Sequence, residues 1–528
     1  MDAFRSESFS SYVKEMMEKH HVPGFSIAIV HNGETASAGY GYADVESSKP
    51  CTADTLFDIA SSSKSFTAAA AALLVDDDKK YPEVQYEAIM SRLLPGDFVM
   101  PSAEYTDNVT LEDILSHRSG MPRHDDSYMG PHATHPDDPR SITKNLRNLP
   151  VAVPLRAKHI YCNMMYTVAA YLVEEKTQQS FSSFLEERFF KPLGMESTSP
   201  SRARAKGFGD RLSAGYAWVK KKSAHNSYPA PDCVEGEGAG SIVTSVNDLI
   251  KWVKALLYHE GPITEEVYQG LVRLRSIPNP DAKEVKPFES PEIYAAGVEV
   301  YWYRGYKVIG HDGAITGFHS RFFLIPELSL GVAMLGNDLN AEYIVDAIKR
   351  KLIDSVLNIP EDSGKNSDKK EDKESEDAEE KRDEKKEVQQ QTTPLSAYVG
   401  KYWNPGYHTL TVQAKDEKLF VDCTDRSFRT TLTFEHVSDQ TKYIVHLSEI
   451  YEEGDEELKA EFVFEGGRAV RLDQTKYIVH LSEIYEEGDE ELKAEFVFEG
   501  GRAVRLGIDY QEILKKLIWF ELVPEEDT

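Results

Sequence analysis

The stretch DIASSSKSFTAAAAALLV, residues 58–75, sets four serines and a threonine around one lysine at the start of an apolar run. One interpretation is structural, because serine side chains cap the free N–H groups in the first turn of a helix. The other is chemical: Ser61 is a nucleophile and Lys64 is its base. A helix would place these two residues on one face, and its N-terminus would favour negative charge on a reacting oxygen. The stretch alone leaves both interpretations open.

The composition of the chain narrows the functional classes. With 528 residues the chain exceeds a single hydrophobic core, so at least two domains are expected. The formal net charge of −29 argues against a nucleic-acid partner and against attachment to anionic membranes. The N-terminus lacks the apolar segment of a secretory signal, and the longest apolar run, 66–75, is about half of a membrane span.

The cysteines predict a cytoplasmic location. They are scattered, with no CxxC or other metal-ligand spacing, which predicts reduced thiols in a cytoplasmic protein that holds no metal or cofactor. These residues are Cys51, Cys162, Cys233 and Cys423.

Residues 1–358 alternate between helical and strand patterns. A helix is predicted over 8–19, and a β-hairpin follows in GFSIAIVHNGETASAGYGYAD, with Asn32-Gly33 as its turn. Two further strands are predicted around Arg304-Gly305, and RFFLIPELSLGVAML is expected to continue in strand. Helix N-termini are predicted at Thr110 and Ser245, and a long loop over 120–158. These patterns predict an α/β (α+β) fold in which helices flank an antiparallel sheet.

The rest of the chain changes character twice. Residues 359–393 are nearly all charged or polar, so a solvated linker is predicted there. Residues 394–528 contain segments such as HTLTVQA, KLFVDC and TTLTFEHV, which alternate apolar and polar residues as half-buried strands do. A small β-barrel or sandwich is predicted for this C-terminal part.

An identical tandem repeat lies inside that part. The sequence DQTKYIVHLSEIYEEGDEELKAEFVFEGGRAVRL occupies 439–472 and recurs unchanged at 473–506. Repeat arrays usually diverge and need several units to bury a shared face, so the pair indicates either a very recent duplication or an error in assembling the gene model. One copy is expected to supply barrel strands and the other to form a surplus hairpin.

Three short motifs occur in order along the chain. Ser61-Ser62-Ser63-Lys64 is an S-x-x-K motif, a pattern expected by chance at roughly one position in a few hundred. Tyr161-Cys162-Asn163 precedes an amphipathic helix, and Gly310-His311-Asp312-Gly313 ends a predicted strand. HExxH, GxSxG and P-loop patterns are absent. The glycines of 236–240 are interpreted as a turn before the helix at Ser245.

Together with LEDILSHRSGMP, KPLGMESTS and GAGSIVTSVNDLIKW, these motifs resemble the serine β-lactamase-like hydrolases: class C β-lactamases, penicillin-binding DD-peptidases, esterases and D-aminopeptidases. The resemblance implies their fold, with an all-α insert beside the sheet, and an acyl-enzyme on Ser61. It also implies Lys64 as base, Tyr161 as proton relay and Asn163 as a group that orients Lys64 and the substrate. The oxyanion hole would be the N–H groups of Ser61 and Ala314, on the strand edge that includes His311 and Gly313.

One departure from the family pattern affects the expected substrate. His311-Asp312-Gly313 stands where β-lactamases and DD-peptidases carry Lys-Thr-Gly, and a neutral histidine binds a carboxylate less strongly than lysine does. The resemblance therefore implies the esterase and D-aminopeptidase branch, with a small-molecule ester or amide as substrate. Two alternatives stay open: transfer of the acyl group to an alcohol or amine, and a non-catalytic oligomeric scaffold.

The C-terminal part resembles the lipocalin-like domain of some family members, on LSAYVGKYWNPGYHTLTVQAKDEKLFVDC. That resemblance implies partial shielding of the active site or assembly of homo-oligomers, for which pairing of strand edges would be a physical route.

Other polar and aromatic residues receive simpler interpretations. The histidines and aspartates of 124–138 are expected to be solvated and at most to shape the substrate entrance. Cys162 is expected to pack away from the site. Tyr301, Trp302 and Tyr303 fit either core packing or an acyl pocket.

Overall fold

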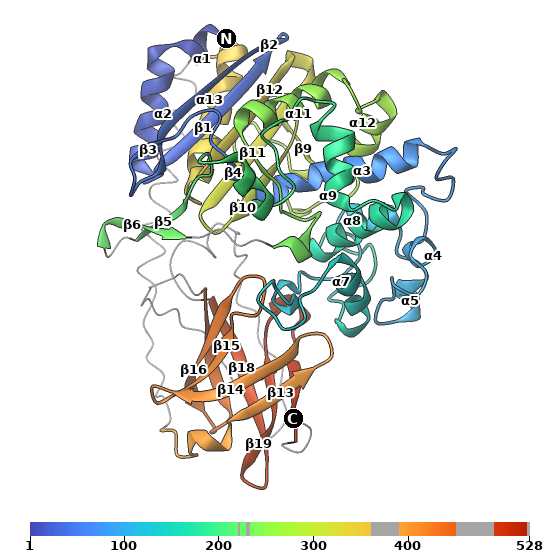
Figure 1. Ribbon diagram of the computed structural model, residues 1–528, viewed down its shortest axis with the longest axis vertical. Coiled ribbons are helices and arrows are strands. Elements are labelled where there is room, and N and C mark those ends of the chain that lie inside the picture. The colour runs from blue at the N-terminus through green and yellow to red at the C-terminus, as the bar shows by residue number, and fades with distance from the viewer. Residues whose placement is uncertain (220–221, 229–232, 361–389, 450–489, 525–528) are drawn as a thin grey trace.

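The computed structural model describes residues 1–219, 222–228, 233–360, 390–449 and 490–524. It consists of a helix-covered sheet and, below it in Figure 1, a closed barrel of antiparallel strands. The predicted linker, 359–393, falls almost wholly outside the described residues.

The main sheet has eight strands in the order β3-β2-β1-β12-β11-β10-β9-β8, and the pairings that the structure records in it are antiparallel. The sequence-predicted hairpin is present as β1 and β2, with Asn32 and Gly33 both at positive φ in the turn. The predicted continuous strand after residue 320 is wrong, because Pro326 opens a short 3₁₀ turn that separates two paired strands. The strands of this sheet are β1 Gly24–His31, β2 Glu34–Asp44, β3 Lys49–Pro50, β8 Ile293–Tyr294, β9 Glu299–Tyr303, β10 Tyr306–Ile315, β11 Phe318–Ile325 and β12 Leu330–Gly336.

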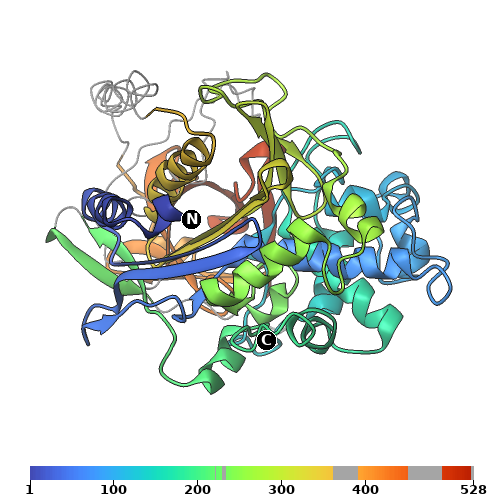
Figure 2. The same cartoon turned by 90° about the horizontal axis from the view of Figure 1, so that it is seen from above.

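Both faces of the sheet are buried, as Figure 2 shows from above. The side chains of β1 point alternately to the two faces of the sheet. Phe25, Ile27 and Ile29 pack with α2 (Glu7–Lys19) and α13 (Ala341–Val356). The side chains of alternate residues, Ala28 and Val30, belong to the larger core that contains α3 (Lys64–Asp76), α8 (Asn163–Thr177) and α11 (Val246–Tyr258). The long Tyr301 and Tyr303 side chains of β9 lie in the α2–α13 core, so the core-packing interpretation of these residues holds.

A helical region leaves the sheet after α3 and returns before α11. The predicted capping box is present at Thr110, whose side chain and that of Asp113 each accept from the other's backbone N–H. The loop predicted over 120–158 is wrong in its second half, where Asp138 caps a helix that begins with Pro139. The remaining helices and short strands are α1 Asp2–Arg5, α4 Met90–Leu93, α5 Ala103–Thr106, α6 Leu111–Leu115, α7 Pro139–Asn145, α9 Phe181–Leu185, α10 Arg202–Ala205, α12 Glu265–Val272, β4 Phe57–Asp58, β5 Gly215–Val219, β6 Ala224–Tyr228 and β7 Val243–Thr244.

The C-terminal part is a closed barrel, in which β13 pairs with β20 to complete the ring. Because a closed ring leaves no free strand edge, the strand-edge route to oligomers expected for this part is wrong for the described strands. Aromatic side chains fill its interior, among them Tyr402 and Tyr443, each of which contacts Phe496 edge to face. Its strands are β13 Gly400–Asn404, β14 His408–Lys415, β15 Lys418–Cys423, β16 Thr430–Ser438, β17 Lys442–Glu449, β18 Glu490–Glu499, β19 Arg502–Ile508 and β20 Ile518–Leu522.

The two copies of the repeat share the barrel. The first copy supplies β17, and the second supplies β18 and most of β19. The expectation that a single copy provides the strands is therefore wrong. The predicted surplus hairpin lies outside the described residues, since 450–489 separate β17 from β18.

The barrel docks against the helical region through its 404–407 and 424–429 loops. His124, expected to be solvated, is buried and shares a hydrogen bond of 2.7 Å with Tyr407 Oη. Asn145 Nδ2 donates to Gly406 O at 2.8 Å, and Gly130 N to Asp425 O at 2.8 Å. These bonds hold the barrel next to the start of the loop 120–138.

Two general expectations concern the whole chain. Cys51, Cys162, Cys233 and Cys423 are thiols that form no disulfide in the described part of the chain. Within the described residues, every helix is too short or too polar to cross a bilayer.

Candidate active site

Ser61 and Lys64 meet at the junction of a 3₁₀ turn, η1 (Ala60–Ser63), and helix α3. Lys64 Nζ lies 2.9 Å from Ser61 Oγ, within hydrogen-bond distance. Ala60, just before Ser61, has a φ of +41°, a backbone conformation that costs a non-glycine residue energy and that clusters at functional sites. Asp58 Oδ1 accepts from Ala60 N at 2.9 Å and supports this turn.

The Lys64 side chain is fully enclosed, with no exposed surface. Its second partner is Ala239 O at 2.8 Å, in the glycine-containing segment interpreted from sequence as a simple turn. Burial, with a smaller contribution from the positive charge of Arg123, lowers the pKa of Lys64 well below its ordinary value. A neutral amine at this position can accept a proton.

The neighbouring serines have separate structural partners, and none caps helix α3. Ser62 Oγ donates to His311 O at 3.2 Å and shares a hydrogen bond of 2.8 Å with Ser320 Oγ, which joins η1 to the sheet. Ser63 Oγ accepts from the N–H of Ile242. The capping interpretation of the four serines is therefore wrong.

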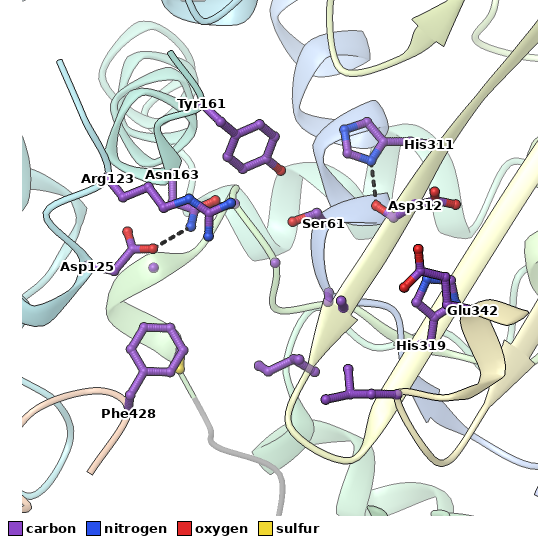
Figure 3. Close-up of a pocket in the computed structure, with 18 of the residues that line it drawn as sticks. Ser61, Arg123, Asp125, Tyr161, Asn163, His311, Asp312, His319, Glu342 and Phe428 are labelled. Carbon is purple, nitrogen blue, oxygen red and sulfur yellow. Dashed lines mark hydrogen bonds between the residues drawn. The ribbon is translucent and has the colours of Figure 1, made fainter. Parts of the chain in front are cut away.

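Tyr161 lies beside Ser61 and Lys64, and Figure 3 shows it next to Ser61. Lys64 Nζ is 4.8 Å from the centroid of the Tyr161 ring. Burial raises the pKa of Tyr161 above its ordinary value, although a hydrogen bond from Ser61 opposes the shift. His117 packs on the same ring at a centroid distance of 4.2 Å and accepts from Cys162 N at 3.1 Å. Tyr161 is thus a neutral phenol whose ring contacts both Lys64 and His117.

Asn163 begins helix α8 and does not bond Lys64 as the resemblance implied. Its Nδ2 donates to Asp125 Oδ2 at 2.8 Å (Figure 3). Asp125 was expected to be a solvated loop residue, yet burial raises its pKa. The guanidinium of Arg123 lies 4.9 Å from the centroid of the Tyr161 ring and lines the same cavity.

The end of β10 passes close to η1. The recorded pairing of β9 with β10 ends at Gly310, so residues 311–315 pair with β11 on one side and face η1 on the other. A side chain at Gly313 would put its Cβ 2.1 Å from Ile59 O, so only glycine allows this approach. Ala314 lines the cavity beside Ser61.

His311 is buried at the back of the site. Its Nε2 shares a hydrogen bond of 2.9 Å with Tyr294 Oη, and its Nδ1 lies 2.5 Å from Asp312 O. Burial lowers the pKa of His311 to about 3, so the ring is neutral at pH 7. Tyr294 also packs against His117, at a centroid distance of 4.7 Å. His117 and Tyr294 thereby connect the motif Tyr161-Cys162-Asn163 to the motif that contains His311.

These groups surround one cavity of about 350 Å³. Of the residues predicted from sequence, it is lined by Ser61, Tyr161, Asn163, His311 and Ala314. Cys162 is buried, as predicted, with its Sγ 3.2 Å from Pro122 O and outside the cavity lining. No cluster of three or more metal-ligating side chains occurs among the residues that the structure describes.

The sequence predicts a loop over 120–158 that lines a binding site, with Asp125 at most shaping the substrate entrance, but it singles out neither Arg123 nor the barrel residues of the lining. Arg123 and Asp125 come from an irregular loop, where no periodic pattern marks a buried residue. Phe428 and Ser427 come from the barrel, and Figure 3 shows the Phe428 ring facing the cavity from below. Ser427 Oγ also donates to the buried Glu235. No local signal in the sequence marks a contact between parts so distant in the chain.

Comparisons with known proteins agree with this arrangement. A family model described as Beta-lactamase matches residues 9–354, and one described as a domain of unknown function, DUF3471, matches 384–487. The protein named "Unguisins hydrolase ungD'" of Aspergillus campestris (strain IBT 28561) is 33% identical over 472 residues, which cover 86% of each chain.

Two solved structures share the fold. The octameric penicillin-binding protein homologue from Pyrococcus abyssi has a TM-score of 0.57 at 19% identity, covering 97% of this chain and 99% of its own. A class C beta lactamase from Rhodobacter sphaeroides has a TM-score of 0.51 at 20% identity, covering 66% of this chain and all of its own. Since the family model spans well over half of the residues, the chain belongs to the beta-lactamase family and is a hydrolase of that family.

Proposed function

We propose that this protein hydrolyses an ester or amide bond of a small molecule through an acyl-enzyme on Ser61. The observation that carries the proposal is the hydrogen bond of 2.9 Å between Lys64 Nζ and Ser61 Oγ, made by a lysine with no exposed surface. A desolvated lysine is a base, and a serine beside a base is a nucleophile. A scaffold without catalysis would have no use for a buried amine at this position.

In the first step, the Ser61 hydroxyl transfers its proton to Lys64 as its oxygen attacks the carbonyl carbon. The N–H groups of Ser61 and Ala314 would stabilise the resulting oxyanion, because the free edge of β10 faces η1. Tyr161, neutral and next to both groups, would then protonate the leaving group. Lys64 would then return its proton to Tyr161. In the second step water attacks the acyl-enzyme and gives its proton to the same Tyr161–Lys64 pair, which passes it to the departing Ser61 oxygen as the acid product leaves.

The motif His311-Asp312-Gly313 disfavours a substrate that carries a carboxylate. His311 is neutral, and Asp312 occupies the place of the threonine in the Lys-Thr-Gly motif of β-lactamases. The relative named unguisins hydrolase supports hydrolysis as the reaction. We therefore place the activity among esterases and amidases rather than with enzymes that open penicillins.

The test is labelling with a fluorophosphonate probe, followed by a screen of p-nitrophenyl esters and D-amino-acid amides. The Ser61→Ala variant should lose the label, whereas Ser8→Ala, the same change at an exposed serine of α2, should keep it. Labelling that survives Ser61→Ala would contradict the assignment. Product analysis with added alcohols or amines separates hydrolysis from acyl transfer.

We also propose that the chain forms homo-oligomers. Its structural relative from Pyrococcus abyssi is described as octameric, and Trp403 on the outer face of the barrel is 48% exposed. Light scattering coupled to size exclusion should give a mass above that of one chain, and Trp403→Ser should lower it. A monomer at all concentrations would contradict this.

A further inference from the structure

Arg123 carries a positive charge that faces the cavity. Among the described residues that line the cavity, it is the single lysine or arginine. It belongs to the loop between α6 and α7, and Figure 3 shows its guanidinium reaching between the Asp125 carboxyl and the Tyr161 ring. The guanidinium carbon lies 4.9 Å from the centroid of that ring, close enough for a cation–π contact.

The Arg123 guanidinium makes no hydrogen bond or salt bridge within the described part of the chain. The acid next to it in the loop, Asp125, accepts from Asn163 Nδ2 at 2.8 Å instead. An arginine side chain stays protonated at every pH at which proteins work. Arg123 therefore brings a permanent charge to the cavity, and no ion pair with a described residue neutralises it.

Two groups of the proposed reaction lie close to this charge. Tyr161 is in contact with it, and Lys64 Nζ lies 4.8 Å from the centroid of the same ring. A nearby positive charge opposes protonation of an amine and stabilises the anion of a phenol. Burial is the first cause of the lowered pKa of Lys64, and the Arg123 charge is the second. Burial raises the pKa of Tyr161, and the hydrogen bond from Ser61 and then the Arg123 charge oppose that rise.

The other titratable groups around Lys64 cannot replace Arg123. A charged Asp125 acts in the opposite direction and raises the pKa of Lys64. His117 and His311 are neutral, because burial lowers the pKa of each ring. The remaining titratable groups that face the Lys64–Tyr161 pair are acids, which are neutral or negative: Cys162, Tyr166, Tyr294 and Glu299.

We propose that Arg123 is a positioning residue whose charge keeps Lys64 unprotonated at rest and stabilises the anion that Tyr161 becomes when it protonates the leaving group. This role rests on the proposed function, because Arg123 acts through Lys64 and Tyr161. When Lys64 then returns its proton to Tyr161, the pair regains its resting state beside the same charge.

The rate of fluorophosphonate labelling, measured against pH on the full chain, tests this role. Ser61 reacts with the probe only while Lys64 can accept its proton, so labelling slows below the pH at which Lys64 becomes protonated. Arg123→Met removes the charge and keeps an unbranched side chain, and it should move this fall to higher pH by at least about 0.5 unit. Arg123→Lys, which keeps the charge, should move it by less than half as much.

Arg188→Met is the matched control. The Arg188 guanidinium also lies over an aromatic ring, that of Phe184 at 5.7 Å, but outside the cavity lining, so its removal should leave the pH profile unchanged. An unchanged profile in Arg123→Met, or an equal shift in Arg123→Lys, would overturn the role of the charge. Arg123→Gln carries the same prediction and replaces the methionine variant if that does not fold.

A second measurement separates the role of Arg123 from the proposed function. Absent or Ser61-independent labelling would contradict the proposed function, and urea unfolding, which needs no reaction, would then decide the role of Arg123. As the pH falls, the stability difference between the chain and Lys64→Met levels off at the folded pKa of Lys64. The same comparison in the Arg123→Met background should level off at a pH at least about 0.5 unit higher. An unmoved pH would overturn the role of Arg123.

Discussion

At the scale of single residues, Lys64 carries an electrostatic cost that follows from its complete burial. An enclosed lysine remains charged only at the expense of its lost hydration, so its pKa falls. Between the pKa in the folded chain and that in the unfolded chain, the unfolded state binds the extra proton. Stability contributed at this position is therefore present above the unfolded pKa and is lost as the pH falls towards the folded one.

Lys64→Met removes this dependence. We expect its free energy of unfolding, relative to that of the unchanged chain, to improve by up to about 1.4 kcal/mol per pH unit as the pH falls from 10 towards the folded pKa. Urea unfolding of both proteins from pH 10 to pH 7 measures this. The same variant should lose at least about 10³-fold in kcat/KM. A stability difference that does not change with pH would mean that Lys64 keeps an ordinary pKa.

The residues that could be predicted from sequence are those that share a local motif. Ser61 and Lys64 are three apart on one turn, and Tyr161 and Asn163 flank the start of one helix, so their spacing is visible in the chain. Asp125 could not be predicted, because its hydrogen-bond partner Asn163 comes from helix α8, 38 residues further along the chain. Lys64's partner Ala239 acts through its backbone, which leaves no signature in side-chain type.

At the scale of elements, the site depends on how closely strand β10 approaches turn η1. Ser62 bridges the two through His311 O, and Gly313 removes the side chain that would separate them. The two hairpins β1–β2 and β9–β10 were predictable from alternation and turn residues, whereas the pairings that join them through β11 and β12 were not. Helix α7 was missed although Asp138-Pro139 begins it, because the surrounding prolines, histidines and aspartates look like loop.

Gly313→Ala should separate these elements, because its Cβ would meet Ile59 O. A displacement of about 1 Å at reacting groups costs about 10²-fold in rate, so we expect that loss in kcat/KM with a folded protein by circular dichroism. Gly207→Ala is the control, since a Cβ there has no atom within 4 Å and should leave activity unchanged. Full activity in Gly313→Ala would show that the close approach is dispensable.

At the scale of the whole molecule, the two copies of the repeat together supply no more of the barrel than β17, β18 and most of β19. The register that pairs Leu447 of β17 with Glu490 of β18 is the one that a single copy would form as a hairpin, with eight residues, 448–455, between the paired ends. Because the copies are identical, deleting 34 consecutive residues anywhere within 439–506 gives the same product.

Deletion of 456–489 should therefore preserve every described strand of the barrel. We expect an unchanged strand signal in circular dichroism, unchanged fluorophosphonate labelling and kcat/KM within about twofold of the full chain. Aggregation or loss of the folded barrel would mean that the second copy is needed for closure. The sequence alone predicts neither outcome, because nothing in the repeat indicates which strand of one copy pairs with which strand of the other.

Because the barrel belongs to the same chain as the domain that carries Ser61, its docking controls access to Ser61. A tether turns docking into an intramolecular event with an effective concentration of about 1 mM. Contacts worth about 4 kcal/mol then suffice to keep Phe428 at the cavity half of the time, and each further 1.4 kcal/mol makes the open form tenfold rarer. A change at Tyr407, which lies on the barrel and outside the cavity lining, would thus set how often large substrates can enter while the chemistry at Ser61 stays the same.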